Sequence, residues 1–294
     1  MMTNHARLNL IMLTTIVGLV IFLYVRPQSH EAPQYRVSLL SAEAAQVIRI
    51  LHKDTLMVLK KTENHWYLTE PINARADEKK VTQLLEILSA TSEHRFPLTD
   101  LDRFSLDEPN VKLSIDHESF DFGGLTPVTN QQYIATEESV FLISPRYAVM
   151  LPSQPIKIVS PTLLAETETP VSFELGDVSI KKQEEDWIIN PENIEQSLSQ
   201  EEINHWVELW QQVAASNLIL DSEILGIDDA ALAQKEIKIS LQNGQKIKFN
   251  VLRHGSELFL MRCDEAIRYV FSGNVGKSLL DPYYISNEPI LFED

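Results

Sequence analysis

The chain is similar to itself, and this internal similarity restricts the possible folds more than any other feature. Residues 60–66 and 181–187 each begin with two lysines and end with a tryptophan, at an offset of 121 positions, and a proline follows each, Pro71 and Pro191. Ordered similarity at a nearly constant offset is the signature of a repeated structural unit. The sequence therefore predicts two tandem copies of one small unit, at about 46–155 and 168–281.

A helical pattern follows the proline in both copies. Apolar residues recur there at i, i+3, i+4 and i+7, which predicts one buried helix face: Val81, Leu84, Leu85 and Leu88 in the first copy, and Ile203, Trp206, Val207 and Trp210 in the second. Ser199 and Glu202 have the spacing of a capping box, and Asp77 is suited to the positive end of the first helix. We expect the aligned Trp206 and Trp210 to be core residues.

Alternating strands come after each helix. Residues 104–107 match 225–228, and the apolar alternation at 111–115 and 237–241 predicts strands in both copies. Gly123-Gly124 and Asn243-Gly244 are typical of turns between strands. Each copy is predicted to end in a short helical segment, near 147–151 or 277–280. The fold class is therefore α+β, with mainly antiparallel sheets plus helices.

An uncharged segment precedes the two copies. Eighteen residues from Leu8 to Val25 lie between Arg7 and Arg26, and at about 1.5 Å per residue their length approaches the hydrocarbon core of a bilayer. A cleaved signal peptide is the alternative, but the run is long for one and no suitable cleavage site follows it. We predict a single-pass transmembrane helix. Because six residues precede Arg7 and its helix while 269 follow Val25, the C-terminal region is expected on the extracytoplasmic, periplasmic side of the inner membrane.

These features divide the chain into four parts. Residues 1–30 are predicted to be a short cytoplasmic tail and the membrane anchor, and 31–155 the first α+β repeat. Residues 156–167 are a proline-rich connector, and 168–294 are the second repeat with a C-terminal tail. The apolar part of that tail, within 283–292, either covers the second sheet or contacts a partner.

Composition argues against nucleic-acid binding and excludes sites that need several cysteines. The net charge is −17, which argues against binding nucleic acid through its phosphates. The chain has one cysteine, so neither an intrachain disulfide nor a cysteine-based zinc site is available.

The order of motifs in the first copy resembles a known family. Trp66, Pro71 and the acid-capped helix precede Phe104–Pro109, and Phe120–Gly123 comes next. This pattern is similar to the bacterial domain-of-unknown-function family 4340, and the similarity is best over 46–155. The resemblance implies one N-terminal membrane helix, an extracytoplasmic region and an accessory role near a gliding-motility-type ABC transporter. It implies no catalytic residues.

Several segments suggest chemistry on their own. Gly273–Ser278 ends like a phosphate-binding loop, but Phe271 stands where the first glycine of that motif belongs, so we interpret the segment as a strand-to-helix turn. The eight histidines show no metal-ligand spacing, although a site assembled by folding stays open. Cys263 lies in a strand pattern and is expected to be buried.

Paired carboxylates are the remaining candidates for chemistry, and most are expected to be solvated surface: Glu137-Glu138, Glu184-Glu185-Asp186, Glu201-Glu202 and Asp228-Asp229. The sequence thus assigns no catalytic, cofactor-binding or metal-ligating residue. It predicts a non-enzymatic, membrane-anchored interaction module whose partners are the membrane and envelope proteins. The family resemblance implies that ABC transporter subunits are among these partners. The alternatives are an envelope hydrolase that uses paired carboxylates and a solute-binding protein with a cleft between the repeats.

Overall fold

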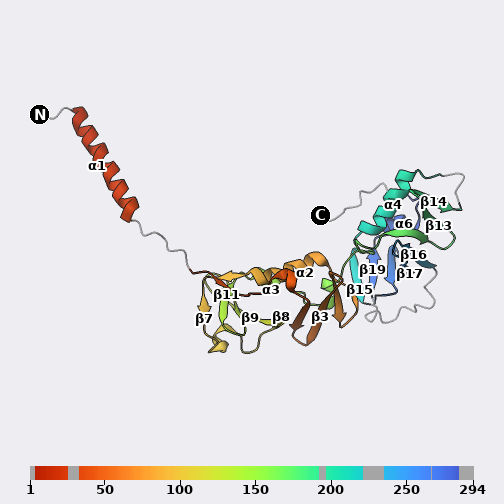
Figure 1. Ribbon diagram of the computed structural model, residues 1–294, viewed down its shortest axis with the longest axis horizontal. Helices are drawn as coiled ribbons and strands as arrows, with labels where there is room; N and C mark the ends of the chain where they lie inside the picture. Colours follow the sequence, from red (N-terminus) through yellow and green to blue (C-terminus); the bar gives the residue numbers. More distant parts are fainter. Residues whose placement is uncertain (1–3, 26–32, 192–196, 221–234, 266, 285–294) are drawn as a thin grey trace.

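The computed structural model describes residues 4–25, 33–191, 197–220, 235–265 and 267–284 (Figure 1). These residues form an N-terminal helix, a two-stranded pair and two large sheets, each of which is covered by helices on one face. The predicted α+β class with mainly antiparallel sheets is confirmed.

Helix α1 (Asn4–Val25) stands apart from both sheets in Figure 1. Its large apolar side chains from Leu8 to Phe22 are all between 49% and 65% exposed. In the part of the chain that the structure describes, no helix combines the length and the apolar character needed to cross a membrane. The transmembrane helix predicted at 8–25 is therefore not supported by the structure.

The first half of the chain builds one antiparallel sheet, which has nine strands among the described residues. In spatial order these are β5 (Ala74–Arg75), β4 (His65–Glu70), β3 (Thr55–Thr62), β2 (Val47–His52), β8 (Val111–Ile115), β9 (Glu118–Leu125), β10 (Gln132–Ala135), β11 (Val140–Ile143) and β7 (Arg95–Phe96). A separate two-stranded pair consists of β1 (Tyr35–Arg36) and β6 (Thr91–Ser92).

The second half builds a sheet with eight strands among the described residues. In spatial order these are β14 (Asp186–Asn190), β13 (Ser179–Gln183), β12 (Pro170–Glu174), β16 (Lys235–Leu241), β17 (Lys246–His254), β18 (Glu257–Arg262), β19 (Ile267–Phe271) and β15 (Asn217–Leu220). In the first sheet β2 lies between its hairpin partner β3 and the later strand β8, and in the second sheet β12 lies between its hairpin partner β13 and the later strand β16. In both, a short strand just after the helix closes the far edge of the sheet.

Helices pack on one face of each sheet. The first half has α2 (Glu78–Leu85) and α3 (Arg146–Val149), and the second has α4 (Gln200–Gln212) and α6 (Gly273–Leu280). Short 3-10 helices occupy Ala42–Ala44, Glu86–Ser89, Leu101–Phe104 and Pro155–Ile158. Both predicted helix starts are confirmed: the Asp77 side chain accepts two backbone N–H groups, and Ser199 and Glu202 form the capping box.

One apolar core runs through both halves. Trp206 and Trp210 are buried in it, as predicted, and they pack against Phe173 and Phe249. The predicted connector contributes Ile158, Val159, Leu163 and Leu164 to the same core, all at most 1% exposed. The connector is therefore packed between the sheets.

The turn predicted at Gly123-Gly124 is wrong, because both glycines lie inside β9. The chain passes close above them: a Cβ on Gly123 would overlap the carbonyl oxygen of Phe104 and lie 2.7 Å from Leu106 Cγ. Glycine is required here by the close approach of two backbones. The matching segment predicted at 225–228 lies outside the described residues.

We expect Gly123→Ala to destabilise the fold by about 1–3 kcal/mol, because overpacking forces the segment at 104–106 away from β9. The neighbouring Gly124→Ala is the control, since its Cβ would come no closer than 3.2 Å to any of its neighbours. The measurement is the free energy of unfolding by urea. An equal effect of both substitutions would contradict the close-approach explanation.

Candidate functional site

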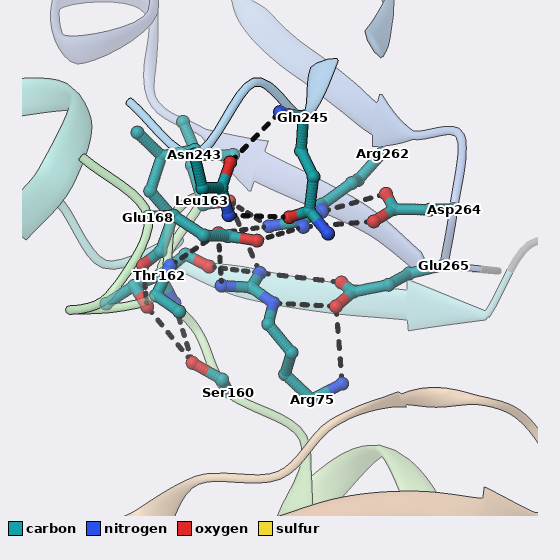
Figure 2. A network of polar contacts seen from close by, with 12 residues as sticks. Arg75, Ser160, Thr162, Leu163, Glu168, Asn243, Gln245, Arg262, Asp264 and Glu265 are labelled. Atoms are coloured by element: carbon teal, nitrogen blue, oxygen red, sulfur yellow. Dashed lines mark hydrogen bonds and ion pairs between the residues drawn. The ribbon is translucent and has the colours of Figure 1, made fainter. Parts of the chain in front are cut away.

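A cluster of ionisable side chains, most of them buried, joins the two halves of the chain (Figure 2). We call it the joint, and it consists of Arg75, Glu168, Arg262, Asp264, Glu265 and Tyr269. Arg75 comes from β5 in the first half, Glu168 precedes β12, and the other residues belong to β18, β19 and the turn between them. Arg75, Arg262 and Glu265 are between 2% and 7% exposed.

Arg75 crosses from one half into the other. Its Nε atom donates to Glu265 Oε1 at 2.6 Å, and its Nη2 atom donates to the Tyr269 hydroxyl at 3.0 Å and to the Thr162 carbonyl at 2.8 Å. The backbone N–H of Arg75 also donates to Glu265, at 3.2 Å. The backbone on both sides of Arg75 is held as well, because Ser160 N–H donates to the Arg75 carbonyl and Asp77 N–H to that of Ile158.

Arg262 holds the second layer of the joint. Its two terminal nitrogens donate to the two carboxylate oxygens of Glu168, at 2.8 and 2.5 Å, and a second pair of bonds reaches Asp264 at 2.8 and 2.9 Å. A further bond to the Leu163 carbonyl ties this arginine to the connector. Two-bond pairing of this kind fixes direction as well as distance.

The ionised forms in the joint are stabilised by their partners. Burial opposes the ionisation of Glu168 and of Asp264, but the hydrogen bonds from Arg262 outweigh burial and lower both pKa values. Burial raises the pKa of the Tyr269 hydroxyl against the opposing charge of Arg75. Tyr269 therefore stays protonated and donates to Glu265 Oε2 at 2.6 Å.

The polar groups of the joint are occupied by other groups of the chain. Its two arginines and three carboxylates bond mainly to one another and to backbone carbonyls of the connector. Among the described residues, Arg75 Nη1 is the one buried side-chain nitrogen or oxygen without a hydrogen bond, and it lies 3.7 Å from Glu168 Oε2. Such an arrangement fixes the relative position of two sheets, and the space between the halves is filled by it and by the apolar core.

The paired carboxylates predicted from sequence are spread over the surface. Glu137-Glu138, Glu184-Glu185-Asp186 and Glu201-Glu202 are exposed, and they belong to different turns and helices. Asp228-Asp229 lies outside the described residues. The structure brings none of the described pairs together with another.

The glycine-rich segment at 273–278 forms the start of α6, not a phosphate-binding loop. Gly276 allows the helix to lie against β18, because a Cβ there would come within 2.6 Å of Leu258 Cβ. Further along, the Ser278 carbonyl accepts the indole N–H of Trp206 at 2.7 Å. Glycine serves helix–sheet packing at this position.

The other candidates are single residues. His94, His117 and His205 are exposed, and the described part of the chain has no group of three or more His, Cys, Asp or Glu able to hold a metal ion. The burial predicted for Cys263 is wrong: it lies beyond the end of β18, in the exposed turn. Partial burial and the nearby Glu236 raise the pKa of its thiol, which disfavours the reactive thiolate.

The described residues line two clefts of notable size. One of about 800 Å³ lies between α4 and the residues after α6, beside Trp206 and Tyr284. The other, of about 540 Å³, lies at the far end of the first sheet, where residues 34–39 meet the β10–β11 turn. Neither contains residues of the joint.

Sequence reasoning missed the joint. The residues come from three distant segments, so no local spacing marks them. One signal was present: Leu258 and Leu260 point to the core along β18, and the same alternation places Arg262 on that buried face. An arginine at a core position of a strand indicates a buried partner elsewhere in the chain.

A family model described as domain of unknown function (DUF4340) matches residues 66–238, which is more than half of the chain. The chain belongs to this family. The DUF4340 match begins at the tryptophan of β4 and ends in β16, so it extends over parts of both sheets and beyond the 46–155 expected from the first copy alone. Comparison with curated proteins and with solved structures gives no match.

We expect Arg75→Met to lower the free energy of unfolding of this DUF4340 protein by about 3–5 kcal/mol, because it leaves Glu265 buried without its cation. The control is Arg49→Met, which removes an exposed arginine from β2 in the same sheet. Adding Glu265→Gln to Arg75→Met should recover part of the loss in a double-mutant cycle. Strictly additive effects would show that the two residues are not coupled.

The joint also predicts a pH dependence. The lowered pKa values of Glu168 and Asp264 mean that the folded state binds fewer protons than the unfolded state in mildly acidic solution. Their contribution to stability is therefore present above the ordinary values of 4.5 and 3.8 and is lost as the pH falls through the folded values.

Glu168→Gln should be less stable than the natural chain near neutral pH, by about 1.5–3 kcal/mol for bonds to a charged group, and should lose less on acidification. The measurement is urea unfolding at several pH values from about 6 to 3. The control is Glu166→Gln, which removes an exposed carboxylate two residues away. Equal acid sensitivity of Glu168→Gln and the natural chain would contradict the assignment.

Proposed function

We propose that this DUF4340 protein is a non-enzymatic, membrane-attached interaction module whose two sheets are copies of one unit. The observation that carries the proposal is the joint. The buried members of the joint, Arg75, Arg262, Glu265 and Tyr269, bond to other groups of the chain, so they hold the two sheets together and are not presented to a substrate.

Two features support the copied unit. The two sheets have the same order of strands: β2 corresponds to β12, β8 to β16, and the edge strand β7 to β15. In addition, the backbone N–H of each tryptophan donates to a side chain in the first turn of the following helix: Trp66 to Glu78 and Trp187 to Gln200, both at 2.8 Å. Unrelated units would not be expected to share this bond.

Helix α1 supports attachment to a membrane. Its apolar side chains face solvent all around the helix, and no charged residue lies between Arg7 and Arg26. Exposed apolar surface on this scale marks a site of contact with lipid or protein. We propose that this segment attaches the protein to the inner membrane, with the two sheets on the periplasmic side.

The partner follows from the family resemblance and not from a bound molecule. We propose subunits of an ABC-transporter-like envelope complex, contacted through the outer faces and edges of the two sheets. The envelope hydrolase has less support, because the described carboxylate pairs are exposed and apart. A solute-binding protein needs a hinged cleft, and the packed connector and joint argue against a hinge.

We expect the full chain to remain in the membrane fraction after alkaline washing. The variant carrying Leu13→Arg and Val17→Arg should appear in the soluble fraction, since an arginine in the middle of a membrane helix costs about 2.5–3.5 kcal/mol. Leu13→Ile with Val17→Ile is the matched control. Release of the natural chain by the wash would contradict membrane anchoring.

The partner is tested by co-purification of the full chain, tagged after Asp294, from detergent-solubilised membranes. We expect ABC transporter subunits to be enriched over a control in which residues 1–32 carry an unrelated folded domain. Enrichment that is equal in both samples, or absent from both, would contradict the accessory role.

A further inference from the structure

The corner of the second half that receives Arg75 has a counterpart in the first half. In the second sheet this corner is the turn between β18 and β19, and it carries Asp264 and Glu265. In the first sheet the corresponding turn joins β10 and β11, and it carries Glu137 and Glu138. Both turns lie next to the short edge strand that closes the sheet, β15 or β7.

The segment beside each turn also corresponds. Thr162 in the connector forms a bridge with Ala214, just after α4. Tyr35 and Arg36 in β1 pair in the same way with β6, after α2 and its 3-10 extension. Each pairing brings the chain that leads into the half alongside its carboxylate-bearing turn.

The two corners differ in what occupies them. In the second half, Arg75 fills the corner and bonds to Glu265 and to the carbonyl of Thr162. In the first half, the same corner is the cleft of about 540 Å³, whose lining includes residues 34–39 and the turn residues Thr136, Glu137 and Glu138. Its size is ample for an arginine side chain and the extended backbone that carries it.

The charges of the cleft favour a cation. Glu118, Glu137 and Glu138 lie on its lining together with Arg36 and Arg95, which leaves one carboxylate in excess. Arg95 is already engaged, because its Nε atom donates to Ser139 Oγ at 2.7 Å and its Nη2 atom lies 3.4 Å from Glu138. An incoming guanidinium would balance the remaining charge.

The non-polar part of the lining points to arginine rather than lysine. Tyr35 supplies partly exposed aromatic surface, and Leu39 is 89% exposed. A guanidinium stacks on aromatic faces and pairs with a carboxylate through two parallel bonds, whereas an ammonium acts as a point charge.

We propose that this cleft is a docking socket for an extended segment of a partner protein that presents an arginine, as β5 presents Arg75 to the second half. The proposal rests on the interaction module proposed above and names its contact surface. The partner strand lies beside residues 34–36 and inserts its arginine toward Glu137 and Glu138.

The probe is a synthetic peptide that copies residues 72–77 of this chain, the segment that fills the corresponding corner. It is titrated into the isotopically labelled full chain in detergent micelles while backbone NMR signals are followed. We expect saturable shifts at residues 34–39 and 136–138. Replacing the peptide arginine by glutamine should weaken binding about tenfold or more, because it removes a charge-assisted pair.

Protein variants give the second arm of the test. Glu137→Gln with Glu138→Gln should weaken peptide binding to the same extent, while Glu184→Gln with Glu185→Gln, an exposed pair in the β13–β14 turn, should not. Absence of shifts at the cleft, or equal binding of the arginine and glutamine peptides, would overturn the socket.

This outcome is separate from the test of function. A chain that co-purifies with transporter subunits but does not bind the peptide would keep the interaction module and lose the socket. A chain that binds the peptide at the cleft and captures no transporter subunit would keep the socket and lose the accessory role.

Discussion

The buried guanidinium of Arg75 is the interaction on which the arrangement of this protein depends. A charged group nine-tenths removed from water is tolerated only where carboxylates and carbonyls surround it closely. Here those groups come from the opposite half and from the connector. The position of the first sheet is therefore specified by atoms of the second, and the two halves form one body with a continuous core.

The apolar core holds the two sheets together, and the hydrogen bonds of the joint determine their relative orientation. Apolar contacts between two sheets and a connector are non-directional, so many sliding arrangements would bury similar area. The forked hydrogen bonds of Arg75 and Arg262 are satisfied in one arrangement, because each carboxylate oxygen has an assigned donor. Buried ion pairs are weak evidence of stability, and their value here is the choice of one geometry.

The elements built from local rules were predictable from the sequence, and those built by tertiary approach were not. The caps at Asp77 and Ser199 and the turn at Asn243-Gly244 follow from interactions within a few residues, and the structure has them where the sequence predicts them. The same reasoning gave a wrong turn at Gly123, because the sequence alone does not distinguish a glycine in a turn from a glycine required by a crossing backbone. The joint was missed because Arg75 and Glu265 are 190 residues apart in sequence and meet only after both sheets have formed.

An interaction module of the kind proposed has to present its surfaces at fixed separation, and the positions of the polar core residues agree with that requirement. Along β18 and β19, Leu260 and Phe271 face the core of their own half, while Tyr269 contacts Arg75 of the first half and Arg262 contacts the connector. On this face of β18 and β19, polar side chains replace apolar ones at the end of the strands that lies at the joint. A force applied to one sheet through a partner would therefore pass to the other through bonds that resist sliding, and the far end of the first sheet would move with the second as one piece.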